Sequence, residues 1–376
     1  MPVMPDLIQE VGNVDLSQAA IWGGALTVIY AINQFLFSPT VGGLSDAYGR
    51  RPVLLIALLV MSLDYLVMAF APSLWLLFLG RFIGGITAAT HSAAAAYMAD
   101  ISTSEDKAKN FGLLGAAFGV GFILGPMLGG LLAEFGSRAP FFAAAALAFA
   151  NMLLGYFFLP ESLKKASRRA FDWRRANPLG AFKQMKTLPN LTPMLLAFLL
   201  LSIAFFVYPS IWAFFGRAQF NWDARMVGLS LAAYGLGIVI VQGVLIRPIL
   251  ARFGEKITAL FGMCMHLLTF LVYPWMTETW HVFAFMPISV FSALAVPALQ
   301  GLMSNSVPEN AQGELQGALS SLTALATIIS PFVMTQTFSY FTKSDAPFYL
   351  PSAPFLVSAL SIIVAFYLFS RWKPVS

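Results

Sequence analysis

Two ionisable side chains lie inside apolar stretches of this sequence, where they are placed to carry a proton or bind a charged group. Asp64 stands midway along an apolar run at 52–71, and Arg81 lies within the next run at 74–99. An aspartate or arginine at the centre of a membrane helix costs about 2.5–3.5 kcal/mol, so such residues are usually functional and face the bundle interior. Asp64 and Arg81 are therefore the first candidates for chemistry in this chain.

Each of these two residues has a functional and a structural interpretation. Low-dielectric surroundings favour the neutral form of a carboxyl group, which makes Asp64 a candidate proton carrier or a contact for a cationic drug. The alternative for Asp64 is a protonated acid that only joins neighbouring helices. Arg81 requires a carboxylate or helix carbonyls, either in proton coupling or in a purely structural ion pair.

The composition places these residues in a membrane protein. Of the 376 residues, 59% are hydrophobic and 10% are charged, whereas soluble domains have about 25% charged residues. The single cysteine, Cys264, excludes an internal disulfide framework, and no Cys/His pattern predicts a metal site or cofactor. The net charge of +5 is attributed to membrane topology, so no nucleic-acid partner is expected.

The chain contains eleven apolar runs long enough to cross a bilayer as helices, since a span needs roughly 20 residues. They lie at about 18–41, 52–71, 74–99, 109–134, 140–159, 191–216, 226–250, 257–276, 280–303, 313–341 and 347–371. Placing residues 1–17 outside puts 17 of the 22 Lys and Arg residues in inside segments, as the positive-inside rule requires. The C-terminus is then cytoplasmic, and the protein is a multi-pass protein of the cell inner (plasma) membrane.

This topology raises a question about residues 1–17, which contain no Lys or Arg and resemble no signal peptide. The segment from Met1 to Ile8 resembles the last turns of a helix, so we expect a first span ahead of it. A genuine eleven-helix protein is the alternative.

The longest polar segment divides the chain into two halves. We predict an N-terminal helix bundle at 1–160, a basic cytoplasmic linker at 161–189 and a C-terminal helix bundle at 190–376. Both halves carry a basic turn between two spans, at 42–52 and 247–256, with glycines Gly49 and Gly254 at the turns. Repeated halves of this kind are how many transporters build an alternating-access site near the midplane.

Several motifs resemble the signatures of the major facilitator superfamily. GGLSDAYGRRP (42–52) resembles its Gly-x-x-x-Asp-x-x-Gly-Arg-Arg element, GRFIGGITAAT its Arg-x-x-x-Gly element, and GFILGPMLGG (121–130) the antiporter signature of its drug/proton exporters. SLDYLVMAF (62–70) and residues 296–325 resemble the tetracycline efflux branch. The resemblance implies an all-α integral membrane fold of two pseudo-symmetric six-helix bundles. Its implied function is proton-coupled export of small amphipathic, tetracycline-like drugs by alternating access.

The resemblance assigns roles to three sets of residues. Those with an expected gating role are Gly42, Asp46, Gly49, Arg50 and Arg51; the alternative is a helix-capping turn with topology-setting arginines. The antiporter motif comprises Gly121, Gly125, Pro126, Gly129 and Gly130, and its glycines at every fourth position predict close helix packing. The expected substrate-cavity residues are Gln34, Thr87, Gln242 and Gln300, which have neighbouring helices as alternative hydrogen-bond partners.

The sequence departs from the tetracycline exporters at two positions. Ile238 stands where they have a histidine, and His266 where they have an aspartate. A histidine titrates near neutral pH, so His266 is either an alternative proton carrier, beside Asp64 and Arg81, or a satisfied core histidine. The expected partners are a small-molecule substrate (a metal-chelated tetracycline is one candidate), protons and the lipid bilayer, and the protein is expected to be a monomer.

Three other functions are alternatives to proton-coupled drug export. A major facilitator carrier for another metabolite or drug is the first, and a truncated, inactive remnant is the second. The third, an intramembrane enzyme, is disfavoured because the three histidines lack the spacing of a metalloprotease motif. We therefore expect that the protein is not an enzyme.

Overall fold

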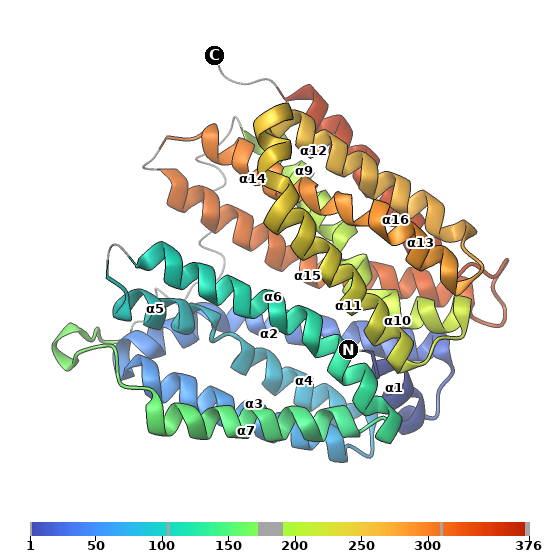
Figure 1. Cartoon of the computed structure of the whole chain (residues 1–376). Coiled ribbons are helices and arrows are strands. Elements are labelled where there is room, and N and C mark those ends of the chain that lie inside the picture. The colour runs from blue at the N-terminus through green and yellow to red at the C-terminus, as the bar shows by residue number, and fades with distance from the viewer. Residues whose placement is uncertain (1, 104–105, 172–190, 309–310, 373–376) are drawn as a thin grey trace.

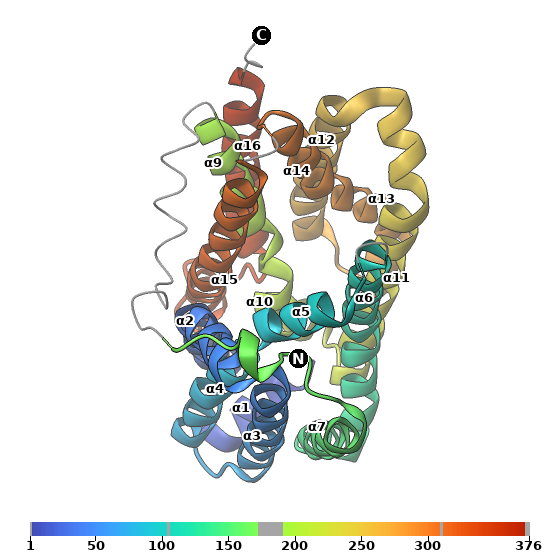
Figure 2. The same cartoon turned by 90° about the vertical axis from the view of Figure 1, so that its left-hand side faces the viewer.

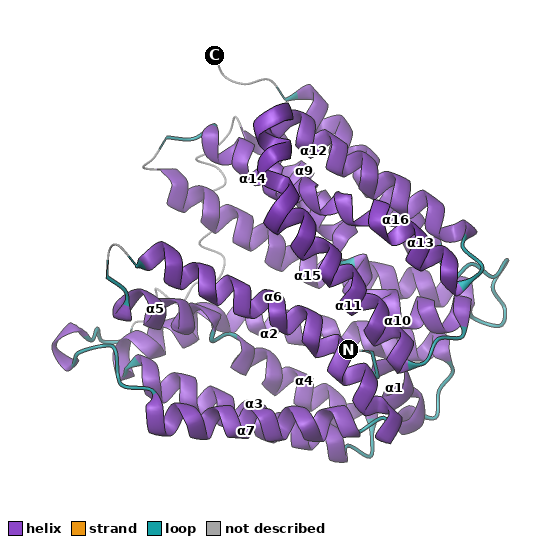
Figure 3. Cartoon of the chain, in the orientation of Figure 1, coloured by secondary structure: helices purple, strands orange, loops and turns teal. Residues whose placement is uncertain are grey.

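The chain folds almost entirely into helices. The computed structural model describes residues 2–103, 106–171, 191–308 and 311–372 (Figure 1), and these residues form helices and loops without a strand (Figure 3). Lipid offers no hydrogen-bond partners to a backbone, so an apolar chain in a bilayer satisfies its N–H and C=O groups within helices.

The helices of the N-terminal half pack as layers in which α3 contacts both α4 and α7, and α2 contacts α4. They are α1 (Met4–Gly12), α2 (Leu16–Tyr48), α3 (Arg50–Phe70), α4 (Leu74–Ala88), α5 (His91–Ile101), α6 (Lys107–Leu132) and α7 (Ala139–Phe158). The segment from Met1 to Ile8 was expected to be the end of a helix, and α1 is helical as far as Gly12.

In the C-terminal half, α9 contacts α15 and α16, and α12 contacts α14 and α16. The helices are α9 (Thr192–Phe205), α10 (Val207–Phe220), α11 (Ala224–Ile240), α12 (Ile246–Val272), α13 (Thr279–Ser289), α14 (Ala295–Asn305), α15 (Gln312–Thr342) and α16 (Ala353–Arg371). The linker predicted at 161–189 is described only as far as Phe171; residues 172–189 lie outside the described part of the chain.

The predicted spans correspond to these helices with local differences. In the described residues, nine helical stretches are long and apolar enough to cross a membrane. One of them, Ala224–Trp275, has 52 residues, about 78 Å at 1.5 Å per residue, far more than the roughly 30 Å of a bilayer core. Gly254, at φ +73°, interrupts it. With that division and with α6, each of the eleven expected spans has a helical counterpart.

Several predicted spans are less regular than expected. The span at 191–216 breaks between α9 and α10, and the one at 226–250 contains a π-helical segment, Val241–Leu245. The span at 74–99 breaks between α4 and α5, and the one at 280–303 contains a tighter 3₁₀ segment, Val290–Leu294, between α13 and α14. The last span was expected from 347 but begins at Ala353, with Pro354 in its first turn, a position that proline favours.

The two halves meet along two helix pairs, α2 with α15 and α6 with α11, which lie side by side in both Figure 1 and Figure 2. Polar contacts between the halves gather at the end expected to face outside. Asp6 of α1 pairs with Arg217 of α10, and Arg225 binds Glu134 at 2.9 Å. Ion pairs thus join the two halves at the end that the sequence predicts to face outside.

The four basic residues of the expected outside loops all have acidic partners. Besides the two pairs just described, Arg138 lies 3.1 Å from Glu10 and Lys343 lies 3.2 Å from Asp345. Pairing neutralises the positive charge on the side that the positive-inside rule keeps free of excess cations.

Candidate functional site

Asp64 occupies a slot in the surface of α4. Its side chain, from α3, is only 4% exposed, and it lies against Gly80 and Gly84, which are one helical turn apart. A Cβ atom on Gly80 would stand 2.9 Å from the Asp64 Oδ1 atom, and one on Gly84 would stand 2.6 Å from Oδ2. The carboxyl group therefore fits because α4 has no side chains there.

The same carboxyl group lacks full hydrogen bonding. Asp64 Oδ1 has no hydrogen-bond partner among the described residues. An unsatisfied buried acceptor is costly for a carboxylate, whereas a protonated carboxyl group needs less compensation. The slot is thus suited to a group that gains and loses a proton.

Arg81 lies one residue after Gly80 and rests on an aromatic ring. Its guanidinium carbon is 4.0 Å from the centre of the Tyr30 ring on α2, a cation–π contact. No carboxylate of the described residues lies within 4.0 Å of the Arg81 guanidinium nitrogens. The structural ion pair considered for Arg81 is therefore absent from this part of the chain, and Tyr30 takes its place.

A cavity of about 230 Å³ lies between the halves, with Arg81 in its wall. Residues near the N-terminus, of α2 and of α6 form its N-terminal side together with Arg81, and half of the residues on its C-terminal side are aromatic. Its lining includes Gly23, Thr27, Arg81, Pro126, Phe205, Tyr208, Ser210, Trp212, Phe214, Ser230, Leu231, Tyr234 and Tyr273. The cavity is mostly apolar with a few polar groups, as in typical small-molecule sites.

The aromatic wall is fixed by its own contacts. The Trp212 indole N–H donates to Ser230 Oγ at 2.9 Å, and its ring centre lies 5.5 Å from that of Tyr273. The Tyr208 and Tyr234 ring centres are 5.6 Å apart. These rings present a rigid apolar surface on the opposite side of the cavity from Arg81.

None of the four predicted cavity residues lines this cavity. Gln34 is exposed, with its amide 3.4 Å from the Ala88 carbonyl, and Gln242 is exposed and donates to the Ala293 carbonyl at 3.0 Å. Thr87 donates to the Gly84 carbonyl at 3.0 Å, and Gln300 is half-buried. The cavity instead lies around Arg81 and the aromatic wall.

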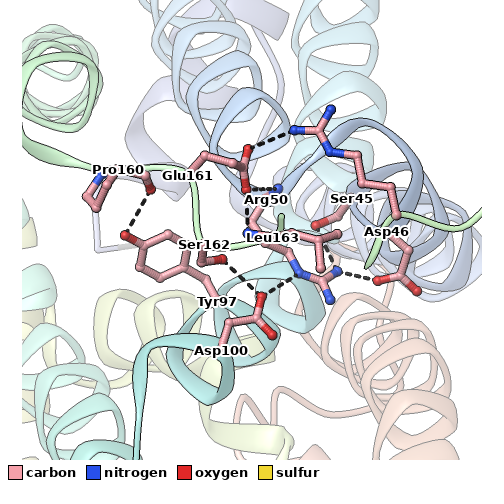
Figure 4. Close-up of polar contacts among 10 residues, drawn as sticks. Ser45, Asp46, Arg50, Tyr97, Asp100, Pro160, Glu161, Ser162 and Leu163 are labelled. Carbon is pink, nitrogen blue, oxygen red and sulfur yellow. Dashed lines mark hydrogen bonds and ion pairs between the residues drawn. The ribbon is translucent and has the colours of Figure 1, made fainter. Parts of the chain in front are cut away.

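The gating motif forms a cluster at the inner ends of α2 and α3 (Figure 4). Arg50 pairs with Asp46 one turn away, and its side chain also reaches Asp100 at 3.2 Å and Ser45 Oγ at 3.2 Å. The Arg50 backbone N–H donates to Glu161 at 2.9 Å. Asp46 therefore pairs with an arginine, and Glu161 caps the start of α3.

Gly49 makes the turn between α2 and α3 possible. Its φ of +110° lies in a region that residues with a side chain rarely adopt, and the matching turn in the second half has Gly254 at φ +73°. Both turn glycines were predicted from the repeated motif, and both predictions are confirmed.

The first part of the linker passes over this turn. Arg168 Nη2 lies 3.8 Å from Glu161, and the Arg169 backbone N–H donates to the Asp46 carbonyl at 3.2 Å. Arg51, next to the turn, binds the Tyr156 carbonyl of α7 at 2.6 Å. A Cβ on Gly42 would be 3.3 Å from Ser92 of α5. The motif thus connects α2, α3, α5 and α7.

The antiporter motif packs differently from the prediction. Cβ atoms placed on Gly121 and Gly125 would meet nothing within 4 Å, and one on Gly129 would meet only Pro2 at 3.8 Å. The close approach is at Gly130, where a Cβ would lie 2.6 Å from the Ala224 carbonyl oxygen on α11. The expectation of tight packing along the glycine row is wrong for Gly121 and Gly125, because that face of α6 points away from neighbouring helices.

The tight contact also involves Gly228 of α11. A Cβ on Gly228 would lie 2.5 Å from the Pro126 carbonyl oxygen and 3.1 Å from the Gly130 Cα atom. Pro126 cannot donate a backbone hydrogen bond, and it also borders the cavity. The end of the motif, rather than its start, joins the two halves.

His266 is buried away from the cavity. It is 1% exposed and packs on Phe270 with ring centres 5.6 Å apart. Its Nδ1 atom has no hydrogen-bond partner among the described residues. It therefore lies in the core with one ring nitrogen unpartnered among the described residues, unlike the satisfied core histidine considered from sequence.

Sequence reasoning missed several residues of the site. The Gly80/Gly84 pair carried a usable signal, since two glycines one turn apart beside Arg81 open a face of α4. Asp100 and Glu161, which complete the Arg50 cluster, stand at the ends of spans and carried no such signal. Tyr30 is one of many aromatic residues, and its role depends on the packing of α2 against α4.

Comparison with known proteins agrees with the fold. The family model described as Major Facilitator Superfamily matches residues 1–331 and 210–376. Among solved structures, the nucleoside transporter NupG has a TM-score of 0.73 at 14% sequence identity, covering 99% of this chain and 98% of that one. A bacterial homologue of the human lysosomal transporter Spinster, in an inward-facing and unoccupied conformation, has a TM-score of 0.75 at 14% identity, covering 100% and 94%. These two likenesses concern the fold alone.

Relatives of known function are closer in sequence. The class C tetracycline resistance protein of Escherichia coli is 40% identical over 339 residues, which cover 90% of this chain and 85% of that protein. The class G tetracycline resistance protein of Vibrio anguillarum is 39% identical, with 90% and 86% covered. Multidrug resistance protein 1 of Bacillus subtilis is 28% identical, with 99% and 91% covered.

Proposed function

This chain belongs to the Major Facilitator Superfamily, and we propose that it exports small amphipathic drugs of the tetracycline type in exchange for protons. The named relatives support this substrate class, because their similarity extends over nearly the whole chain. The protein works as a monomer in the inner membrane with its C-terminus in the cytoplasm, an orientation supported by the distribution of basic residues. It moves its substrate unchanged.

The observation that carries the proposal is the environment of Asp64. Its carboxyl group is buried in the slot made by Gly80 and Gly84, and one of its oxygens has no partner among the described residues. Arg81, the residue after Gly80, reaches the cavity. In this proposal Asp64 binds a proton in one conformation and releases it in the other. Arg81 stabilises the ionised form through its positive charge.

Alternating access requires the closed outer end to open while the inner end closes. The Arg50 cluster, with Asp46, Gly49 and Arg51, acts as the inner gate in this proposal. It connects helices of the N-terminal half that must move as a unit, and its ion pairs stabilise one of the two conformations.

The substrate reaches the cavity along a path from the inner side. Gln34 lies eleven residues, or three helical turns, after Gly23 on α2, whereas Gln242 lies in the π-helical segment Val241–Leu245 that follows α11. Residues at the spacing of Gly23 and Gln34 share a helix face, and Gly23 lines the cavity. We therefore propose that Gln34 lies on the inner continuation of the same path, and Gln242 stays a proposal for that region. Thr87 and Gln300 are also proposed to line that region, although neither residue lines the cavity.

His266 is proposed as a second proton-binding group. Its support is the unpartnered Nδ1 atom in a buried position. A proton arriving there gives the imidazole a second N–H donor that needs a partner, so protonation favours a rearrangement of the surrounding helices.

The proposal is tested in inside-out membrane vesicles that contain the protein. A pH gradient should drive tetracycline uptake, and a protonophore should abolish it. Asp64→Asn should remove gradient-driven uptake while the protein remains in the membrane in normal amount. Asp345→Asn, in an exposed loop far from the slot, is the matched control and should transport normally. Undiminished gradient-driven uptake by Asp64→Asn would remove Asp64 from the mechanism.

A further inference from the structure

Tyr30 of α2 lies against α4, beside the slot that holds Asp64. A Cβ atom on Gly85 would stand 2.4 Å from the Tyr30 carbonyl oxygen, so the backbone of α2 rests directly on α4 at this residue. A Cβ on Gly84 would stand 2.6 Å from Asp64 Oδ2 and 3.6 Å from Tyr30 Cε2. The carboxyl group and the edge of the tyrosine ring therefore lie over the same glycine.

Arg81 is placed on the same face of α4. It precedes Gly84 by three residues and Gly85 by four, the spacing at which residues share a helix face. Its guanidinium carbon lies 4.0 Å from the centre of the Tyr30 ring. The face of the ring thus carries the cation, and backbone packing at Gly85 fixes where that ring lies.

Asp64 and Arg81 attract each other without forming a contact ion pair. Their charges interact electrostatically, yet no ion pair between described residues joins the two side chains. Tyr30 and Tyr65 are the other titratable residues that interact with both charges, and tyrosine is uncharged near neutral pH because it titrates at about pH 10. Among the described residues, Arg81 is thus the charged group that acts on Asp64.

The separation of the two charges matters for proton binding. A guanidinium in direct contact with a carboxylate attracts it strongly where the dielectric constant is low, and bidentate hydrogen bonds strengthen the contact. An acid held in this way stays ionised and accepts a proton with difficulty. With Arg81 on the Tyr30 ring, Asp64 Oδ1 has no partner among the described residues and is able to bind a proton.

We propose that Tyr30 is a positioning residue for proton coupling: its ring holds the Arg81 guanidinium outside ion-pair distance of Asp64, so that the acid can gain and lose a proton. This inference rests on the proposed export function and adds to it the residue that sets the spacing of the two charges. The ring performs this role rather than the hydroxyl group, because a cation–π contact uses the face of the ring, which phenylalanine also provides.

The experiment measures how fast the Asp64 carboxyl group reacts with dicyclohexylcarbodiimide, an apolar reagent that modifies protonated carboxyl groups. Purified protein in detergent is treated at pH 7, and modification of the peptide that contains Asp64 is followed by mass spectrometry. Tyr30→Leu frees Arg81 to pair with Asp64 and should slow the reaction at least about tenfold, since a direct opposite charge shifts the protonation of an acid by about tenfold to a thousandfold. Tyr30→Phe keeps the ring and should react as fast as the parent protein.

A second substitution and a matched control connect the result to Arg81. Adding Arg81→Gln to Tyr30→Leu removes the cation, so the reaction of Asp64 should be at least as fast as in the parent. The control is Tyr367→Leu, because the Tyr367 ring also supports an arginine, Arg371, at 4.8 Å, but lies at the inner end of α16. This variant should react as the parent does.

Four outcomes would overturn the proposal: no reaction of Asp64 in the parent protein, equal rates for Tyr30→Leu and the parent, a slow reaction in Tyr30→Phe, or a slow reaction in Tyr30→Leu that persists when Arg81→Gln is added. If Tyr30→Leu does not fold, Tyr30→Met replaces it with the same expectation, since methionine fills irregular space without a ring. The reaction needs neither drug nor proton gradient, so its failure is distinct from a failure of gradient-driven transport.

Discussion

Asp6 and Arg217 form an ion pair that joins the two halves at their outer end. Asp6 belongs to α1 and Arg217 to the last turn of α10, so the pair spans the boundary that alternating access has to open. The Gln9 amide oxygen accepts a further bond from Arg217 at 3.3 Å. Both contacts stabilise the conformation described here, in which the two halves meet at this end.

Removing this pair should shift the protein toward the outward-open conformation. Partly exposed ion pairs contribute about 0.2–1 kcal/mol, so Asp6→Asn should change the ratio of the two conformations by up to about fivefold. The measurement is the labelling rate of a cysteine introduced at Ser210 in the cavity, with a reagent added from outside and Cys264 replaced by serine. The doubly exchanged variant, with Arg at 6 and Asp at 217, should restore slow labelling. Unchanged labelling in Asp6→Asn would show that the pair does not hold the outer end closed.

The contact between Gly228 and Gly130 predicts a strong effect of side-chain size. Gly228→Val places a Cβ where the Pro126 carbonyl oxygen is 2.5 Å away, and overpacking of this kind costs about 1–3 kcal/mol. The variant should unfold at a lower temperature in detergent than the parent protein. The control is Gly121→Val, in which the same change meets open space. Equal melting temperatures for the two variants would contradict the packing described for α6 and α11.

The slot around Asp64 predicts that a single methyl group disturbs coupling. Gly84→Ala brings a Cβ to within 2.6 Å of Asp64 Oδ2, so the carboxyl group must move away from Arg81 or α3 must shift. Gradient-driven uptake should fall, whereas exchange of drug across the membrane without a gradient should be affected less. Gly119→Ala lies on α6 in open space and should behave as the parent. Normal coupling in Gly84→Ala would mean that the slot does not position the carboxyl group.

The Arg50 cluster predicts that Asp100 is a gating residue although it lies outside the recognised motif. Asp100→Asn removes the charged partner 3.2 Å from Arg50 Nε and should slow transport without reducing the amount of protein in the membrane. Asp106→Asn, in the following loop, is the control. A transport rate equal to that of the parent would restrict the gate to Asp46 and Arg50.

The fold was predictable from the sequence because bilayer physics leaves few choices. The lengths of the apolar runs predicted the membrane-spanning helices. The turns at Gly49 and Gly254 were predicted from a repeated motif whose backbone conformation requires glycine. The position of Gln34 relative to the cavity was not predictable. Helix periodicity predicts which face of a helix a residue lies on, but it does not predict at which depth in the membrane the two halves come together. The contact at Gly130 was missed for a related reason: the glycine row on α6 is longer than the part that meets α11.

The Asp64 site was predictable in part. A charged side chain in an apolar run is energetically costly and therefore rare, so the sequence alone was enough to select Asp64 and Arg81. Their surroundings depend on which residues of α2 and α4 face one another, and no local pattern encodes that Tyr30 rather than an acid lies against Arg81.

The two sides of the cavity differ in composition, and this difference affects how the substrate range of the exporter can evolve. The ionisable residues that we propose couple export to protons, Asp64 and Arg81, belong to α3 and α4, whereas the rings of Tyr208, Trp212 and Tyr273 belong to the other half of the chain. A mutation that replaces one of those aromatic residues by a smaller or larger one alters which compounds fit the cavity and leaves the residues proposed for proton coupling unchanged. Resistance to a new compound can therefore arise by substitutions in α10 or at Tyr273 alone.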